Sequence, residues 1–339
     1  MRLTTLLLLL IGAPACCVYA AEQTEGKAIM YQWTKVTEQA PFAARDGAGA
    51  LVFKGKMWLL GGWNPGDRRH FPKICNSEVW SSTDGKAWTL EILQAPWEGR
   101  HTAGYVVFKD RMWIVGGDPL QGHYHPDVWN SADGVHWEKV ADNVPWNPRV
   151  LHYTLVFKDK IWVMGGQTLP QFAPAEEKFY GDVWSSDDGK TWTKVADNLP
   201  WAPRGMIGGS VVFKDRMWIV GGGTYDTPNR PKRIFYNDVW SSADGAHWTQ
   251  AAATTPWRPR QYHDVAVFDG NMWVLEGYSD DIGNRKDVWY SPDGVQWTEV
   301  PDTPWAPRHA ASVFIYDNAL WMVAGNNMTP DVWKLTRVK

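Results

Sequence analysis

The side chains best suited to chemistry gather in two stretches where an otherwise regular sequence becomes irregular. These stretches are residues 63–76 and 224–237. Their basic side chains are Arg68, Arg69, His70 and Lys73 in the first and Arg230, Lys232 and Arg233 in the second. Guanidinium and ammonium groups pair with carboxylates, sulfates and phosphates. The stretches therefore predict a site for an anionic ligand, such as an acidic glycan or an acidic protein segment, unless their charges are only solvated.

A carboxylate interrupts a third stretch. In WVLEGY, Glu276 replaces the first of the paired glycines that WIVGGG carries at 218–223. A carboxylate at the end of a strand is a candidate general acid or base, so Glu276 is our candidate catalytic residue. The alternative is structural, with Glu276 paired to a nearby arginine such as Arg260.

Arginines and acidic residues recur together along the chain. The arginines are Arg45, Arg100, Arg149, Arg204, Arg260 and Arg308. The acidic residues, each directly before Val-Trp, are Glu78, Asp127, Asp182, Asp238, Asp287 and Asp331. A ring of arginines would form an anion site in which Arg149, Arg260 and the neighbouring His263 bind ligand. The matched numbers favour the other interpretation, in which each arginine pairs with one carboxylate.

Metal chemistry has a weaker basis. His123 and His125 form an HxH pair whose rings would project the same way from an extended segment, as metal ligands do. The sequence offers no third or fourth ligand to complete the set. We therefore predict no metal site and no cofactor.

These residues belong to a repeat with a period of about 50 residues, which reads PWAPR, VFKDRMWIVGG and NDVWSSADGAHWT in one copy. Short apolar runs around tight polar turns predict four antiparallel strands per unit, named a to d here. Six units predict an all-β fold, a six-bladed β-propeller of four-stranded antiparallel blades. Most of the 24 tryptophans occur once per unit, which favours packing between blades over a sugar-binding platform.

The two ends of the chain predict how the ring closes. The sixth unit stops after DVWKL at 331–335, without a strand d. The missing strand occurs at the other end as YQWTKV, 31–36, which matches the strand that contains Trp192. The N-terminal strand should therefore complete the last blade and remove a free sheet edge.

At this level the chain resembles the kelch-repeat β-propellers. The resemblance rests on the paired glycines after strand b, the arginine before strand a and the tryptophan of strand d, and it covers residues 31–335. It implies the fold, but kelch propellers include protein-binding adaptors, sugar epimerases and the copper domain of galactose oxidase. Tyr262-His263 resembles copper ligands of that oxidase, yet the mature chain offers only Cys75 for the oxidase's Tyr–Cys crosslink.

A second resemblance concerns the Asp-Gly turns. VWSSDDGKTWTKV at 183–195 is similar to the Asp-box of sialidases, but only this copy has the second aspartate, Asp187, in the required register. All five copies place Asp directly before Gly. An Asp-Gly pair makes a tight turn because glycine adopts positive φ and aspartate bonds its own backbone. We therefore interpret the motif as a structural hairpin.

The length, the net charge and the N-terminal residues limit the partners, the domain bounds and the location that the sequence allows. The 339 residues carry a formal charge of −3, which argues against a nucleic-acid partner bound by bulk positive charge. Residues 1–20 have the charged start, apolar run and small residues of a signal peptide, which leaves 21–339 as the propeller domain. We expect a secreted or periplasmic protein with no membrane span.

The most variable connections join strands b to c and d to a, and they emerge on one face of the ring. Loops on a rigid scaffold commonly carry function, so we expect a ligand or partner to bind there. The leading prediction is a binding protein, with an anionic glycan as one ligand. The alternatives are an enzyme acting on an acidic sugar, similar to a sialic acid epimerase, and a scaffold in an envelope or secreted complex.

Overall fold

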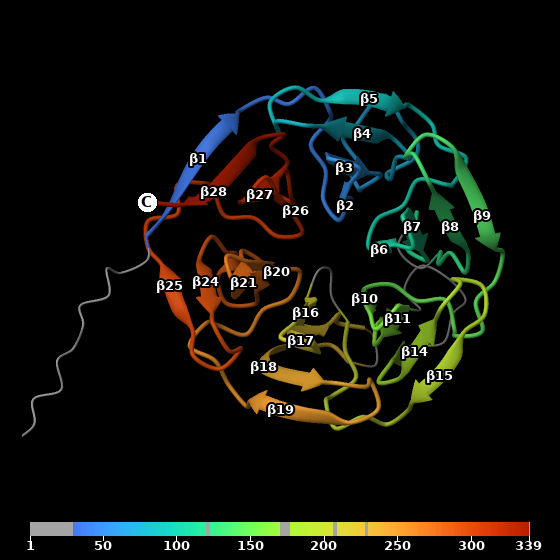
Figure 1. The fold of residues 1–339 in the computed structure, drawn as a ribbon, viewed down its shortest axis with the longest axis vertical. Coiled ribbons are helices and arrows are strands. Elements are labelled where there is room, and N and C mark those ends of the chain that lie inside the picture. Colours follow the sequence, from blue (N-terminus) through green and yellow to red (C-terminus); the bar gives the residue numbers. More distant parts are fainter. Residues whose placement is uncertain (1–29, 120–122, 170–176, 206–208, 228–229, 339) are drawn as a thin grey trace, which may run out of the picture.

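Six blades surround a central axis (Figure 1). The computed structural model describes residues 30–119, 123–169, 177–205, 209–227 and 230–338, so the predicted signal peptide lies outside the described residues. Within these ranges the strands form six four-stranded antiparallel sheets and two small two-stranded ribbons. The predicted fold class is therefore confirmed.

The first three blades follow the chain from the inside of the ring to the outside. Blade one comprises β2 (Gly49–Phe53), β3 (Lys56–Leu60), β4 (Val79–Ser82) and β5 (Thr89–Ile92). Blade two comprises β6 (Gly104–Phe108), β7 (Arg111–Val115), β8 (Val128–Ser131) and β9 (Trp137–Ala141). Blade three comprises β10 (Tyr153–Phe157), β11 (Lys160–Met164), β14 (Val183–Ser186) and β15 (Thr193–Ala196).

Blades four and five repeat this order. Blade four comprises β16 (Ser210–Phe213), β17 (Arg216–Thr224), β18 (Ile234–Ser242) and β19 (Trp248–Ala252). Blade five comprises β20 (Asp264–Phe268), β21 (Asn271–Leu275), β24 (Val288–Ser291) and β25 (Thr298–Val300). The ribbons are β12 (Gln167–Thr168) with β13 (Lys178–Phe179), and β22 (Tyr278–Ser279) with β23 (Gly283–Asn284).

Blade six joins the two ends of the chain. It comprises β26 (Ser312–Tyr316), β27 (Ala319–Val323) and β28 (Val332–Arg337), and β1 (Tyr31–Thr37) is its outer strand. β1 pairs antiparallel with β28 in a register that sets Tyr31 opposite Arg337 and Trp33 opposite Leu335. This pairing confirms the closure that the sequence predicts, and it protects the outer edge of β28.

Apolar packing between neighbouring blades holds the ring together. Met57 and Leu59 of blade one share a buried cluster with Phe314 and Trp321 of blade six, and comparable clusters lie at the other junctions. Each large apolar side chain buried in this way contributes about 1.5–3 kcal/mol. The ring is thus a rigid support for its loops.

The Asp-Gly turns add a second link between blades. Asp84 accepts backbone hydrogen bonds from Lys86 and Ala87 at 2.8 Å, and Gly85 adopts φ +70°. A Cβ at Gly85 would lie 2.2 Å from the Trp321 ring of the neighbouring blade. The equivalent glycine–tryptophan contacts are Gly134–Trp58, Gly189–Trp113, Gly245–Trp162 and Gly294–Trp218. The motif is therefore a structural turn, as predicted.

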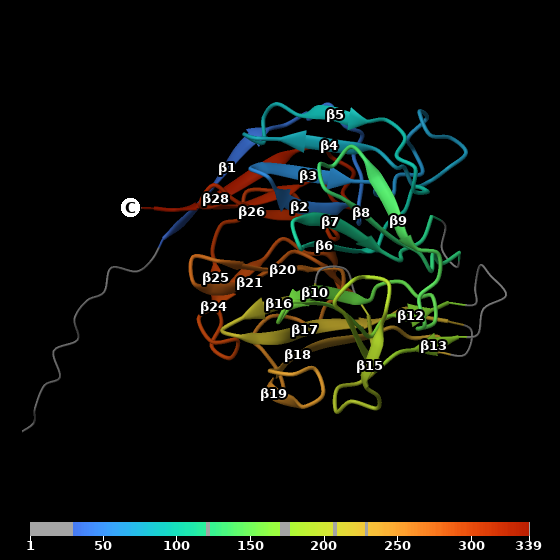
Figure 2. The same cartoon turned by 45° about the vertical axis from the view of Figure 1, so that its right-hand side comes forward.

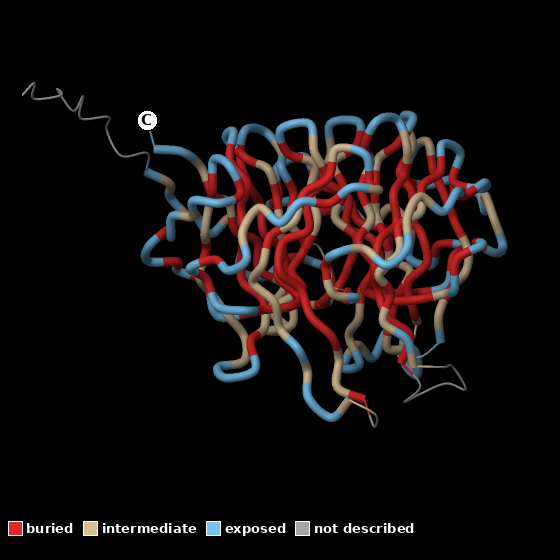
Figure 3. The backbone as a smooth tube through the Cα atoms, turned by 90° about the horizontal axis from the view of Figure 1, so that it is seen from below, coloured by how far each residue is buried: buried red, intermediate tan, exposed pale blue. Residues whose placement is uncertain are grey.

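The two faces of the ring differ. One carries short exposed turns, whereas longer loops extend from the other (Figures 2 and 3). The longer loops are the b–c connections, which include both ribbons. Among the residues described, no helix has the length and hydropathy needed to cross a membrane.

Candidate functional site

Each of the recurrent arginines, called column arginines below, forms a buried ion pair within its own blade. In blade one, the Nε of Arg45 donates to the carbonyl of Ala43, Nη1 to the carbonyl of Gly61 and Nη2 to Glu78 Oε2 at 2.6 Å. The other pairs are Arg100–Asp127, Arg149–Asp182, Arg204–Asp238, Arg260–Asp287 and Arg308–Asp331. All six arginines are at most 1% exposed. Arg149 and Arg260 thus lie inside their blades, and the pairing interpretation describes the whole set.

Five of the six paired carboxylates have a lowered pKa, which favours their charged form. Burial alone would raise the pKa of Glu78, but the charge and hydrogen bond of Arg45 lower it to about 2. The indole of Trp80 also donates to Glu78, at 2.8 Å. Equivalent tryptophans bind the carboxylates of the other five blades. This network fixes the start of strand c against the arginine.

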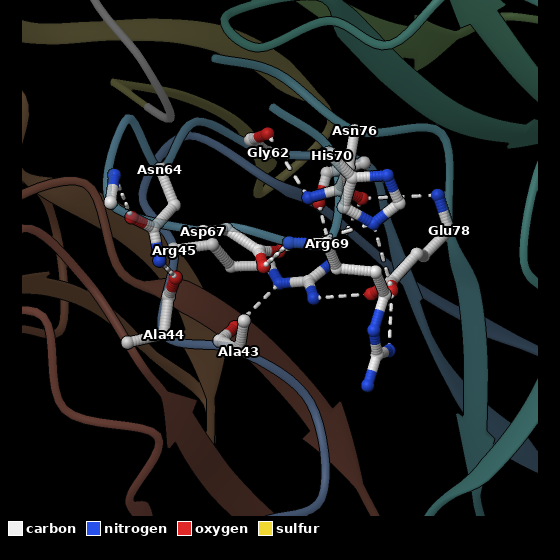
Figure 4. Close-up of polar contacts among 12 residues, drawn as sticks. Ala43, Ala44, Arg45, Gly62, Asn64, Asp67, Arg69, His70, Asn76 and Glu78 are labelled. Carbon is white, nitrogen blue, oxygen red and sulfur yellow. Dashed lines mark hydrogen bonds and ion pairs between the residues drawn. The ribbon is translucent and has the colours of Figure 1, made fainter. Parts of the chain in front are cut away.

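The basic loop of blade one is drawn in Figure 4. Arg69 donates to Glu78 Oε1 at 3.0 Å, and His70 Nε2 lies 3.0 Å from the same oxygen. These two predicted ligand residues therefore serve the carboxylate of their own blade. Arg68 and Lys73 are exposed, and Arg69 also faces solvent although it pairs with Glu78.

The basic loop of blade four divides in the same way. Arg233 donates to Asp226 at 2.7 Å, and its guanidinium lies over the rings of Tyr225 and Tyr278. Arg230 lies over Phe179 at 4.3 Å. Lys232 is exposed. Blades one and four stand on opposite sides of the ring, so the loops approach the axis from opposite directions (Figure 1).

Glu276 is fully buried, and its side chain does not pair with an arginine. Arg260 donates instead to the backbone carbonyl of Glu276 at 2.8 Å, which corrects the expected side-chain pairing. Glu276 Oε2 accepts a hydrogen bond from the Gly277 amide at 2.6 Å, and the neighbouring carboxyl group is that of Asp264, the first residue of β20. Burial raises the pKa of Asp264 to about 7, and burial together with Asp264 raises that of Glu276 well above its usual value. Both shifts favour the protonated, neutral form of these buried carboxyl groups.

The backbone of Glu276 is strained. It adopts φ +49°, the left-handed conformation that Gly61, Gly116, Gly165 and Gly221 adopt at the same position in blades one to four. A non-glycine residue there costs about 1 kcal/mol or more. Asp264, but not Glu276, lines a channel cavity of about 300 Å³ between the inner strands.

The predicted histidine sites lie apart from one another. His263 is fully buried, and its Nε2 donates to the carbonyl of Val220 at 2.9 Å, while burial and Arg260 lower its pKa to about 3. His123 and His125 have ring centroids 6.0 Å apart. Throughout the described part of the chain, no three His, Cys, Asp or Glu side chains are arranged to hold a metal ion.

A pocket at the axial end of the channel was not predicted from the sequence. This mouth pocket has a volume of about 130 Å³. Its lining residues are Asp46, Trp63, His101, Thr102, Tyr225, Tyr262, His309, Ala310 and Asn326. The volume is room for about four waters, or a small polar ligand. It lies on the face with the longer loops, because Trp63 and Tyr225 come from the b–c loops of blades one and four.

A backbone turn directs these side chains to the axis. The second residue after a column arginine has positive φ wherever it is described, as at Thr102 (+56°), Tyr262 (+57°) and Ala310 (+51°). Backbone hydrogen bonds then link blades, since Ala310 N donates to the carbonyl of Tyr262 and Gly47 N to that of Ala310. Left-handed non-glycine residues cost energy and cluster at functional sites.

The two histidines of the pocket are held differently. His101 Nδ1 lies 2.9 Å from Asp118 Oδ1 and 3.2 Å from the Asp118 carbonyl, so Nδ1 carries the proton. Burial would lower the pKa of His101, but the Asp118 charge raises it well above its usual value. His309 Nδ1 donates to Asn284 Oδ1 at 2.6 Å, and burial and Arg233 lower the pKa of His309 to about 4.

Cys75 lies beside His101, but its thiol is not suited to act as a nucleophile. Its Sγ lies 3.5 Å from His101 Nδ1, and the thiol is free and buried. Burial raises the pKa of the thiol, so it stays protonated.

One sequence signal points to the mouth pocket. The residue directly after each column arginine varies although the arginine does not, and it is Asp46, His101 or His309 in three blades that adjoin. When a position varies within a regular repeat and carries polar residues in some copies, that position is a candidate for function rather than for packing. The sequence alone does not give the left-handed turn that brings them together.

No protein-family model and no curated protein matches the chain. The assignment of function therefore depends on the site itself.

Proposed function

We propose that the protein is an exported propeller of the kelch-repeat type that binds a saccharide, with acidic sugars among its units, in the mouth pocket. The lining of the mouth pocket is the main support for this proposal. Among the described residues, five of the six blades contribute to its lining, and the lining combines aromatic rings with hydrogen-bonding groups. Sugars present both apolar C–H faces and hydroxyl groups, which is the chemistry that such a lining matches.

The charges around the pocket support an acidic ligand. Arg68, Lys73 and Lys232 are exposed on the two loops that also supply Trp63 and Tyr225. Solvent-facing cations attract an anionic chain without the desolvation that a buried cation requires. The kelch assignment is supported by the paired glycines at the ends of β3, β7, β11 and in β17, and by the closure through β1. The proposed location, secreted or periplasmic, depends on residues 1–20.

Binding of the mature chain, 21–339, to panels of acidic and neutral glycans tests the proposal. We expect Tyr225→Ala to weaken binding about fivefold or more, since an aromatic contact contributes about 1 kcal/mol. Tyr316→Ala is the matched control, because the Tyr316 hydroxyl bonds Gly55 on the opposite face. Binding that is equal in both variants would place the ligand elsewhere.

A second candidate function is docking of an acidic protein segment on the loop of blade one. Phe71 is 78% exposed there, between the exposed cations Arg68 and Lys73. An exposed aromatic residue flanked by cations suits a partner with both apolar and acidic side chains. Phe71→Ser would abolish such docking and leave saccharide binding unchanged.

A further inference from the structure

The mouth pocket contains two histidines that occupy equivalent places in different blades. His101 follows the column arginine of blade two, and His309 follows that of blade six. Blade one stands between them and contributes Asp46 from the same position. Asn326 connects the group, because its Nδ2 donates to Asp46 Oδ2 at 2.9 Å and its N donates to the carbonyl of His309 at 2.8 Å. All four residues line one small cavity.

His101 has the arrangement of a proton donor. Its Nδ1–H is held by the Asp118 carboxylate at 2.9 Å, which fixes the ring and stabilises the imidazolium form. Its Nε2 has no hydrogen-bond partner among the described residues and is not sealed from the cavity. A proton on Nε2 is therefore available to a bound ligand.

His309 has the arrangement of a proton acceptor. Its Nδ1–H is held by the amide oxygen of Asn284 at 2.6 Å, which leaves a lone pair on Nε2. The Tyr262 ring packs against the imidazole with centroids 5.2 Å apart. The Tyr262 hydroxyl is buried and has no partner that meets hydrogen-bond geometry in the described chain. A neutral amide partner, unlike Asp118, does not favour the charged form of the ring.

We propose that His101 and His309 form a general acid–base pair that cleaves a uronic-acid glycoside by elimination. This inference rests on the proposed function, because it takes the saccharide bound in the mouth pocket as the substrate. One donor and one acceptor in a single small cavity meet the requirement of this reaction for two proton transfers. When the surroundings of two titratable groups move their pKa values apart, the group with the higher pKa serves as the acid and the group with the lower pKa serves as the base.

The reaction needs no oxidant, reductant or added group. His309 Nε2 removes the proton from the ring carbon that carries the carboxylate. The electron pair left behind forms a carbon–carbon double bond, and the bond to the glycosidic oxygen breaks. His101 delivers its Nε2 proton to that oxygen. The products are an unsaturated uronate and a new hydroxyl end, and exchange with solvent restores both histidines.

Arg233 gives the reason for an acidic sugar. Its guanidinium lies over Tyr225, which lines the pocket, and over Tyr278, whose ring lies 5.7 Å from that of His309. The positive charge of Arg233 lowers the pKa of His309. A substrate carboxylate beside Arg233 offsets that charge, and so makes His309 a stronger base when substrate is bound. The same contact stabilises the negative charge that develops next to the carboxylate.

The test uses the mature chain with polygalacturonate, alginate and hyaluronan as probes. The conjugated double bond of the product gives an ultraviolet absorbance that binding alone does not produce. We expect product from at least one polymer, and a loss of rate of about 10²–10⁴-fold in His101→Gln and in His309→Gln. Polymer binding, measured by calorimetry, should stay within about threefold in both variants. His247→Gln is the matched control, because His247 pairs with Asp244 at 2.8 Å in an exposed turn on the opposite face.

The pH profile of the rate provides the second readout. Asp118, Asp46 and Cys75 face His101, and Arg233, Tyr262, Tyr278 and Asn284 face His309. A rate that rises as His309 loses its proton and falls as His101 loses its own supports the assignment. Polymer binding without any product overturns this inference and leaves the proposed function standing. Absence of both binding and product overturns the proposed function as well.

Discussion

Two sets of buried carboxyl groups in this ring have pKa values that are shifted in opposite directions. Each carboxylate at the start of strand c faces a column arginine, and in five blades this pairing outweighs burial and lowers the pKa of the carboxylate, at Glu78, Asp127, Asp182, Asp287 and Asp331. Burial raises the pKa of Asp264, and burial together with the neighbouring Asp264 raises that of Glu276. The first set repeats around the ring and stabilises it, whereas the second occurs once and stores a penalty. The difference shows that a shared scaffold can hold one blade in a less stable arrangement.

The two groups of carboxylates should make the stability of the fold depend on pH in different pH ranges. A lowered pKa adds stability that is complete above the unfolded value, so the Glu78 contribution is lost as pH falls from about 4.5 to about 2. A raised pKa acts in the other direction. The Asp264 carboxyl favours the folded state while protonated, so stability falls as pH rises from about 4 to about 7.

Breaking one pair of the first set should have the largest effect. Asp287→Ala leaves Arg260 buried without its counter-charge, and we expect the free energy of unfolding to fall by about 3–5 kcal/mol. Urea unfolding followed by tryptophan fluorescence measures this change. A loss below about 1 kcal/mol would mean that the column contributes nothing to the ring.

Replacing the second set should have an intermediate effect of opposite sign. The double variant Asp264→Ser, Glu276→Ala copies Ser312 and Ala324, which blade six carries at the same positions. We expect it to gain on the order of 3 kcal/mol relative to the wild type between pH 4 and pH 8, because the raised pKa is removed. Unfolding curves of both proteins at three pH values decide the matter. Parallel pH dependences would contradict the raised pKa of Asp264.

An exposed ion pair should show the smallest effect. Arg258 and Asp281 form an ion pair with side chains 56% and 50% exposed, at the end of the same blade as Arg260 and Asp287. We expect Arg258→Ala to change stability by about 0–1 kcal/mol, less still in high salt. The same unfolding assay compares it with Asp287→Ala. Equal losses would show that burial does not decide the strength of these pairs.

Charge reversal on the rim extends the comparison to solvent-facing cations. We expect Arg68→Glu with Lys73→Glu to leave stability within about 0.5 kcal/mol, because both side chains are exposed. Association with an acidic polymer should slow, with a marked dependence on salt. Lys86→Glu with Lys190→Glu makes the same charge change on the opposite face. A similar slowing in that control would point to net charge rather than to the loop.

The fold could be read from the sequence because its cues are local and repeat. Four units carry the glycine pair, five carry the Asp-Gly turn and all six carry the tryptophans of strands b, c and d. The unpaired strand at 31–36 identified the closure. The ion pairs also followed from matched numbers. The mouth pocket could not be predicted from the sequence, because it depends on left-handed turns after the column arginines. Neither threonine nor tyrosine is a residue type that indicates such a turn, as at Thr102 and Tyr262. Glu276 was noticed for its type, but its partner Asp264 was missed because that residue begins an ordinary strand.

The pairing of β1 with β28 also governs the order of assembly. A chain made from its N-terminus cannot finish blade six until residues 332–337 have emerged, so the longest-range contact in the molecule forms last. Without blade six and the turn that precedes it, the mouth pocket would lack the wall formed by His309, Ala310 and Asn326. Ring completion and assembly of the mouth pocket are therefore coupled, and we expect a chain that lacks β1 or β28 to lose both together.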